Sequence, residues 1–202
     1  YTGVFINPIH DNYNGVLQKY SSDELISYRL TSTGWSVGDT PTLKQTIIDF
    51  SSGTPVIGSE TTTCTFDAII ANDTLNTTDG VGFLAGVSTD GMAIVFNNKL
   101  DANFTEHLAG YEISSGRKVF GTYFPTTQRG QDSKIGYEGE FTDVLHYQRG
   151  NGSVNTFQNA KVVGNIIFIH EKQENYRGKQ TAITNFFTSD GKPLTQVGIT
   201  SQ

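Results

Sequence analysis

A pair of carboxylates is the strongest candidate for catalysis in this chain. Glu138 and Glu140 stand two residues apart within Gly136–Phe141. On a strand they share one face, about 7 Å apart. A glycosidase needs two carboxylates roughly 5–10 Å apart across the scissile bond. The pair therefore makes a glycoside-cleaving enzyme one hypothesis, although a solvated strand face explains the same spacing.

The histidines and the single cysteine offer little further chemistry. His10, His107, His146 and His170 are far apart in sequence, and none forms the i, i+2 pair that would place two ligands on one strand face. Cys64 has no second cysteine for an internal disulfide or a zinc site, and we expect it to be a small buried residue on a strand. Nucleotide-binding and nucleophile-elbow motifs are missing as well. We therefore expect no catalytic site, metal or cofactor.

Aromatic residues beside polar residues in predicted loops are better candidates for binding. A flat ring covers the apolar face of a sugar, neighbouring polar groups bind its hydroxyls, and Tyr and Trp also anchor protein interfaces. Trp35 lies in a glycine-flanked polar stretch, although it would serve equally as a core residue. The predicted ligand-binding residues are Asn12, Tyr13, Trp35, Asp39, Tyr123, Arg129, Tyr147, Arg149, Tyr176 and Arg177.

Composition limits the class of protein. The chain has 202 residues, which favours one domain over residues 1–202. Ser, Thr, Asn and Gln together supply 65 residues, and the formal net charge is −6. Without a basic stripe we expect no nucleic-acid partner. Without a long apolar run we expect no membrane insertion.

The same composition predicts an all-β fold. Val, Ile and Thr supply 55 residues, and β-branched side chains suit strands better than helices. Turn dipeptides such as Asp90-Gly91 and Asp190-Gly191 recur, and we expect type I′ hairpin turns there. We predict an antiparallel sandwich or barrel of about a dozen short strands with at most one or two short helices. The predicted strands are 3–6, 16–20, 26–31, 46–50, 63–70, 81–87, 92–97, 118–124, 135–147, 161–170, 181–188 and 194–199.

Two segments carry helix signals. Ser21 and Glu24 have the spacing of a capping box, which could open a helix toward Tyr28. Asp101–Ala109 could form another, ended by Gly110.

Two strands are apolar on both faces. Met92–Asn97 should therefore lie inside a sheet that is covered on both sides, paired with the segment 81–87. The segment 162–169 also alternates apolar residues on both parities, and 171–179 should be a solvent-exposed connection to the next strand.

We expect a non-enzymatic surface recognition domain that binds a glycan or a cell-surface receptor. Polar, Tyr-containing loops resemble the adaptable surfaces of binding proteins, and viral capsid spikes and lectin-like domains share this texture. The missing initial Met indicates a mature product or an excised domain. The sequons at Asn72, Asn76, Asn103 and Asn151 would lie on exposed loops of an extracellular or virion-surface protein.

One alternative is a β-barrel, either a binding protein or an isomerase, that holds a small hydrophobic ligand in a closed cavity. The other two are a glycosidase built on Glu138 and Glu140, and a structural assembly protein. Recognition domains of this kind are commonly dimers or trimers, so we expect a homo-oligomer.

Overall fold

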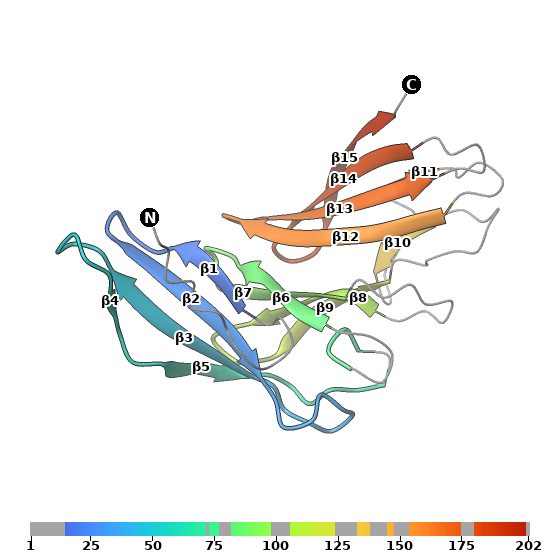
Figure 1. Cartoon of the computed structure of the whole chain (residues 1–202). Coiled ribbons are helices and arrows are strands. Elements are labelled where there is room, and N and C mark those ends of the chain that lie inside the picture. The colour runs from blue at the N-terminus through green and yellow to red at the C-terminus, as the bar shows by residue number, and fades with distance from the viewer. Residues whose placement is uncertain are drawn as a thin grey trace.

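The chain folds as three antiparallel β-sheets (Figure 1). The computed structural model describes residues 15–71, 73–76, 82–97, 106–123, 133–137, 145–147, 154–174 and 180–200. All secondary-structure elements in these ranges are β-strands. The prediction of an all-β fold is confirmed.

The strands follow one another along the chain within each sheet. The N-terminal sheet contains β1 (Gly15–Lys19), β2 (Glu24–Thr31), β3 (Thr42–Asp49), β4 (Val56–Ile57) and β5 (Thr61–Thr65), with β4 and β5 both paired to β3. The central sheet contains β6 (Gly82–Val87), β7 (Met92–Asn97), β8 (Glu106–Glu112), β9 (Lys118–Tyr123), β10 (Ser133–Tyr137) and β11 (Leu145–Tyr147). The C-terminal sheet contains β12 (Val154–Val163), β13 (Ile166–Glu174), β14 (Gln180–Thr188) and β15 (Pro193–Thr200).

The central sheet lies between the other two, and β7 shows why. All six of its residues are buried. Met92, Ile94 and Phe96 belong to an upper apolar cluster shared with the C-terminal sheet. Ala93 and Val95 belong to a lower cluster shared with the N-terminal sheet. The prediction that this strand is covered on both faces, and paired with β6, is confirmed.

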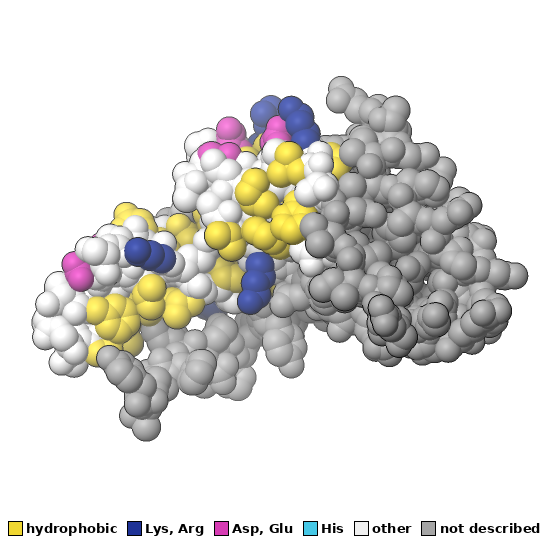
Figure 2. All heavy atoms as spheres, turned by 90° about the horizontal axis from the view of Figure 1, so that it is seen from above, with side chains coloured by type: hydrophobic (Ala, Val, Ile, Leu, Met, Phe, Trp, Pro, Cys, Tyr) yellow, Lys and Arg dark blue, Asp and Glu magenta, His cyan; other side chains and the backbone are white. Residues whose placement is uncertain are grey.

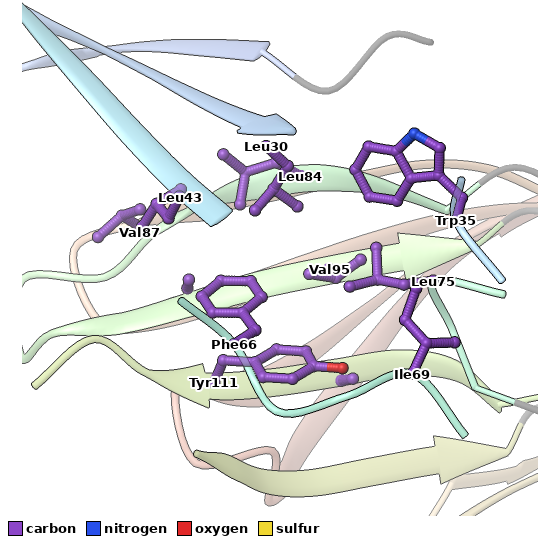
Figure 3. Packing of buried hydrophobic residues seen from close by; sticks show 12 residues of the cluster. Leu30, Trp35, Leu43, Phe66, Ile69, Leu75, Leu84, Val87, Val95 and Tyr111 are labelled. Carbon is purple, nitrogen blue, oxygen red and sulfur yellow. The ribbon is translucent and has the colours of Figure 1, made fainter. Parts of the chain in front are cut away.

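The lower cluster is closed by the segment after β5 (Figure 3). Phe66 stacks on Tyr111 with ring centroids 4.3 Å apart and planes 5° from parallel. Asp73, which is buried, accepts a hydrogen bond from the Tyr111 hydroxyl and lies 3.5 Å from the Lys118 ammonium. The Asp73 carboxylate also accepts a hydrogen bond from the backbone N–H of Leu75, which holds the segment after β5 against the sheet.

In the upper cluster the ring of Phe120 requires two glycines. It crosses its strand partner Gly110, where an added Cβ would stand 2.2 Å from the ring. It also covers Gly191 in the β14–β15 turn, where a Cβ would stand 2.5 Å from the ring. One aromatic side chain thus joins the central sheet to the C-terminal sheet.

Two hairpin turns a hundred residues apart share one hydrogen-bonding pattern. In the β6–β7 turn Ser88 pairs with Met92 through the backbone, and the Ser88 hydroxyl donates to Asp90. Thr188, Asp190 and Lys192 repeat the pattern in the β14–β15 turn. In each turn only the glycine has a positive φ, so these are three-residue connections with a left-handed glycine. The expectation of type I′ turns there was wrong.

The same end of the molecule joins the two sheets through polar groups. The Ser189 hydroxyl donates to the Asp90 carboxylate across the sheets. The Asn165 side-chain oxygen accepts from the Thr89 hydroxyl and from the Asp90 backbone N–H at 3.1 Å. Three hairpin turns are therefore fixed to one another.

Neither predicted helix is present in the described residues. Ser21 and Glu24 do interact, with a 2.9 Å side-chain hydrogen bond, but they close the β1–β2 hairpin, where the Tyr20 N–H donates to the Glu24 carbonyl. Residues 106–109 belong to strand β8, and residues 101–105 lie outside the described residues.

Other differences concern strand ends. The predicted strand 161–170 is a hairpin, because Gly164 and Asn165 form a two-residue turn between Val163 and Ile166. The predicted strand 135–147 is divided between β10 and β11, and the predicted strand 63–70 ends at Thr65. Residues 171–174 continue β13 instead of forming a connection, and the predicted strand 3–6 lies outside the described residues.

Candidate functional site

Trp35 is a core residue and not an exposed platform. Its side chain is only 7% exposed and lies in the lower cluster with Leu75 and Leu84 (Figure 3). Its backbone has a φ of 55°, unusual for a large residue, and the surrounding turn is held by Asp39. The Asp39 carboxylate accepts from the Ser36 N–H at 2.8 Å and from the Thr33 hydroxyl at 3.1 Å. Trp35 thus anchors this turn in the core, and Asp39 holds its backbone.

Of the remaining predicted binding residues, only Tyr123 and Tyr147 lie in the part of the chain that the structure describes. Tyr123 ends β9 and pairs with Gly136, and Tyr147 ends β11 and pairs with Ser133. Both therefore lie on the side of the central sheet away from β6. The other predicted binding residues lie outside the described ranges: Asn12, Tyr13, Arg129, Arg149, Tyr176 and Arg177. The carboxylate pair of the glycosidase alternative, Glu138 and Glu140, lies outside them as well.

The structure also places the cysteine and one sequon. Cys64 pairs with Leu43 in the N-terminal sheet and is half-buried, and this burial raises the pKa of its thiol. Asn76 is buried, contrary to the exposed loop expected for its sequon. The described residues contain no group of acidic, histidine or cysteine side chains suited to a metal ion. Nor do they include a helix with the length and apolar character needed to cross a bilayer.

The first surface with binding geometry is the outer face of the C-terminal sheet (Figure 2). Strand residues alternate between the two faces of a sheet. On β12, β13 and β14 the residues that alternate with the buried upper cluster are Val163, Ile166, Phe168 and Phe186. The rings of Phe168 and Phe186 meet edge to face with centroids 5.1 Å apart.

Two apolar residues on this face or at its border are largely exposed. Val163 is 64% exposed, and Leu194, the extra residue of the β15 bulge between the partners of Phe187 and Phe186, is 52% exposed. We call the five residues Val163, Ile166, Phe168, Phe186 and Leu194 the outer apolar face. Figure 2, drawn from above the C-terminal sheet, shows hydrophobic side chains gathered beside Lys or Arg side chains.

The second surface with binding geometry is a groove of about 370 Å³ where the three sheets meet. It is lined by residues from β1, β6 and β12, namely Gly15, Val16, Leu17, Gln18, Phe83, Leu84, Ala85, Ala160, Lys161 and Val162. Among the described strands, each of these three is an edge strand of its own sheet. We call this site the edge groove.

Gln18 fixes one end of the edge groove. Its side-chain N–H donates to the Val87 carbonyl at 2.8 Å, and its side-chain oxygen accepts from the Val87 N–H at 2.7 Å. The amide group thus pairs with β6 as a neighbouring strand would. No sequence pattern signals this contact, because Gln18 and Val87 are 69 residues apart.

The comparisons with known proteins do not extend this description. No family model, no curated protein and no solved structure matches the chain. The outer apolar face and the edge groove are therefore the basis for a functional inference.

The N-terminal sheet carries a different kind of outer face. Glu60 accepts three hydrogen bonds from the Arg29 guanidinium, the shortest 2.8 Å, and lies 3.4 Å from the Lys44 ammonium. The Arg29 hydrogen bonds lower the pKa of Glu60, with a smaller contribution from Lys44. Acidic and basic groups here neutralise one another, so this part of the face has little free charge to offer a ligand.

Proposed function

We propose that this chain is a surface recognition domain that binds a protein receptor through the outer apolar face of its C-terminal sheet. The observation that carries the proposal is the exposure of Val163 and Leu194 beside the Phe168–Phe186 pair. Contiguous exposed apolar side chains on a sheet face favour a protein partner.

A protein receptor fits this face better than a glycan. A sugar site combines a ring with amide, carboxylate or guanidinium groups for the hydroxyls. Among the residues whose side chains the structure describes, the polar outer-face neighbours of the two rings are Lys161, Thr184, Thr188 and Thr195, none of which carries an amide, carboxylate or guanidinium group. The face thus offers rings and aliphatic groups with few partners for sugar hydroxyls. An extracellular or virion-surface location and a homo-oligomeric state belong to the same proposal.

The closed-cavity alternative has less support. Its signature is an enclosed apolar space, whereas the edge groove is open and has the polar groups of Gln18 and Lys161 in its walls. The interior between the central and C-terminal sheets is filled by the upper cluster.

The test compares charged substitutions at two exposed sites. Val163→Glu with Leu194→Glu places charge on the outer apolar face, and Val56→Glu with Ile57→Glu makes the same change on β4, where both residues are also more than half exposed. Because all four side chains are exposed, both variants should keep the native fold. Labelled chains are then applied to a panel of cell types and to a glycan array, after light scattering fixes the oligomeric state.

We expect cell binding that the outer-face variant loses and the β4 variant keeps. Binding that free sugars compete away would make the ligand a glycan. Equal binding by both variants would refute the role of this face. Loss of a native dimer in the outer-face variant alone would show that the face joins copies of the chain instead.

A further inference from the structure

Three sheet edges meet at the edge groove. Within the described strands, β1, β6 and β12 each pair on one side only, and β6 lies beside both of the others. A strand at the end of a sheet presents unpaired backbone N–H and C=O groups along its free side. The groove therefore has backbone hydrogen-bonding groups in its walls in addition to its side chains.

The end of the groove at Val87 is closed by two contacts. Gln18 occupies the backbone groups of Val87 through its side-chain amide. Gly86 lies so close to β12 that an added Cβ would stand 2.8 Å from the Cβ of Val162. Beyond this end, Phe83, Leu84 and Ala85 line the open part of the groove.

The Gln18 contact shows which kind of group the β6 edge takes. A side-chain amide has the same donor and acceptor as a backbone peptide group. Its two hydrogen bonds to one residue, at 2.8 and 2.7 Å, reproduce the exchange of N–H and C=O between paired strands. The same edge continues from Val87 into the groove, where a peptide backbone would meet the next free groups.

Side chains at the groove favour an acidic occupant. Lys161 lines the groove, is exposed, and makes no ion pair with the described residues. The apolar contribution comes from Val16, Leu17, Phe83 and Ala160. Extended segments bind sheet edges through main-chain hydrogen bonds, and alternate side chains set their specificity.

We infer that the edge groove binds an extended segment of a partner protein, which adds as a strand along β6 and directs a carboxylate side chain toward Lys161. The edge groove borders the outer apolar face at Lys161, which pairs with Phe168, so Lys161 alone does not distinguish the two proposals. Leu17 distinguishes them, because it lies on β1 in the N-terminal sheet.

The experiment selects ligands on the full chain from a displayed library of random linear peptides. Enriched peptides are synthesised unmodified and with N-methyl groups on alternate residues, which removes the edge-pairing N–H donors. Affinities are measured for the native chain and for Lys161→Glu and Leu17→Glu. Lys19→Glu is the matched control, since Lys19 is exposed on the same strand as Leu17 but does not line the groove.

We expect enriched peptides to share an acidic residue among β-branched ones. N-methylation should weaken binding about tenfold or more, because several hydrogen bonds are lost. Lys161→Glu should weaken it about fivefold, Leu17→Glu should also weaken it, and Lys19→Glu should leave it unchanged. Hydrogen exchange at Phe83, Leu84 and Ala85 should slow when the peptide is bound.

Several results would overturn the inference. They are the absence of any enriched peptide, equal binding of N-methylated peptides, and binding that Leu17→Glu does not weaken. Peptides whose affinity falls with Val163→Glu and Leu194→Glu, but not with Leu17→Glu, would bind the outer apolar face instead of the groove. Dimerisation abolished by Leu17→Glu would make a second copy of this chain the occupant.

Discussion

Replacing Gln18 should destabilise the fold by a calculable amount. Gln18→Leu keeps the side-chain size but removes both hydrogen bonds to Val87, a buried residue. Each buried backbone group left without a partner costs about 1–3 kcal/mol. Because the groove is open and water can reach part of this site, we expect a loss of about 2–4 kcal/mol, or roughly 5–15 °C in Tm for a chain of this size.

Gln18→Glu is the sharper variant because its effect should depend on pH. When protonated, the introduced carboxyl group donates to the Val87 carbonyl and accepts from the Val87 N–H, as the amide does. When ionised, it has no donor for that carbonyl, so the folded state raises its pKa above the unfolded value of about 4.3. Its stabilising contribution is therefore complete below about pH 4 and is lost as the pH rises through the folded pKa. The loss is about 1.4 kcal/mol for each pH unit that separates the folded pKa from the unfolded one.

The assay is denaturant unfolding followed by the fluorescence of Trp35, which is the single tryptophan and is buried. Native chain and variants are compared at each pH, so that other titrating groups cancel. The reasoning is refuted if Gln18→Leu lies within about 0.5 kcal/mol of the native chain, the range of an ordinary surface change. It is also refuted if the deficit of Gln18→Glu is the same at pH 4 and pH 7.

Four further substitutions test other parts of the structure. Asn185 is fully buried and neither polar atom of its side chain has a partner, so Asn185→Leu should raise the unfolding free energy by about 1–2 kcal/mol; a decrease would indicate a bound group at this position. Gly116→Ala should destabilise the chain by several kcal/mol, because its Cβ would stand 1.9 Å from a backbone oxygen. Gly53→Ala, with a similar positive φ and open space around it, should cost only about 1–2 kcal/mol, and equal losses in calorimetry would contradict the steric argument. Hydrogen bonding to Arg29 lowers the pKa of Glu60, so the contribution of Glu60 to the unfolding free energy should be present above the unfolded pKa and vanish as the pH falls through the folded pKa. The same contribution should shrink in high salt. Because this pair is exposed, a Glu60→Gln loss above about 1 kcal/mol at neutral pH would exceed what the geometry supports.

Short-range patterns predict the strands well. The run Met92–Asn97 is apolar on both parities, and the structure covers both of its faces. The capping-box spacing of Ser21 and Glu24 does not distinguish a helix from a turn, because the same hydrogen bond also closes a hairpin. The two-residue turn at Gly164 is hidden in the sequence because Val163 and Ile166 continue the apolar pattern across it.

The candidate sites depend on contacts that no local pattern contains. The edge groove joins residues near positions 17, 84 and 161, which only the stacking of three sheets brings together. Trp35 has the sequence context of a loop residue, and only the tertiary structure shows that its ring enters the core. The outer apolar face is hidden as well, because a strand residue's parity does not say which face of a sheet is covered.

The position of β7 also has a consequence for biosynthesis. The lower cluster draws on residues 30–111 and can close once strands β1 to β8 have emerged from the ribosome. The upper cluster needs Ile167, Ile169 and Phe187, so Met92, Ile94 and Phe96 stay uncovered in the meantime. Between residue 111 and residue 187 the ribosome adds 76 residues, so the delay is roughly 4–15 s, during which the nascent chain exposes this hydrophobic surface. A fragment ending at residue 123 should therefore bind a hydrophobic dye strongly and require chaperones to stay soluble, whereas the full chain should not.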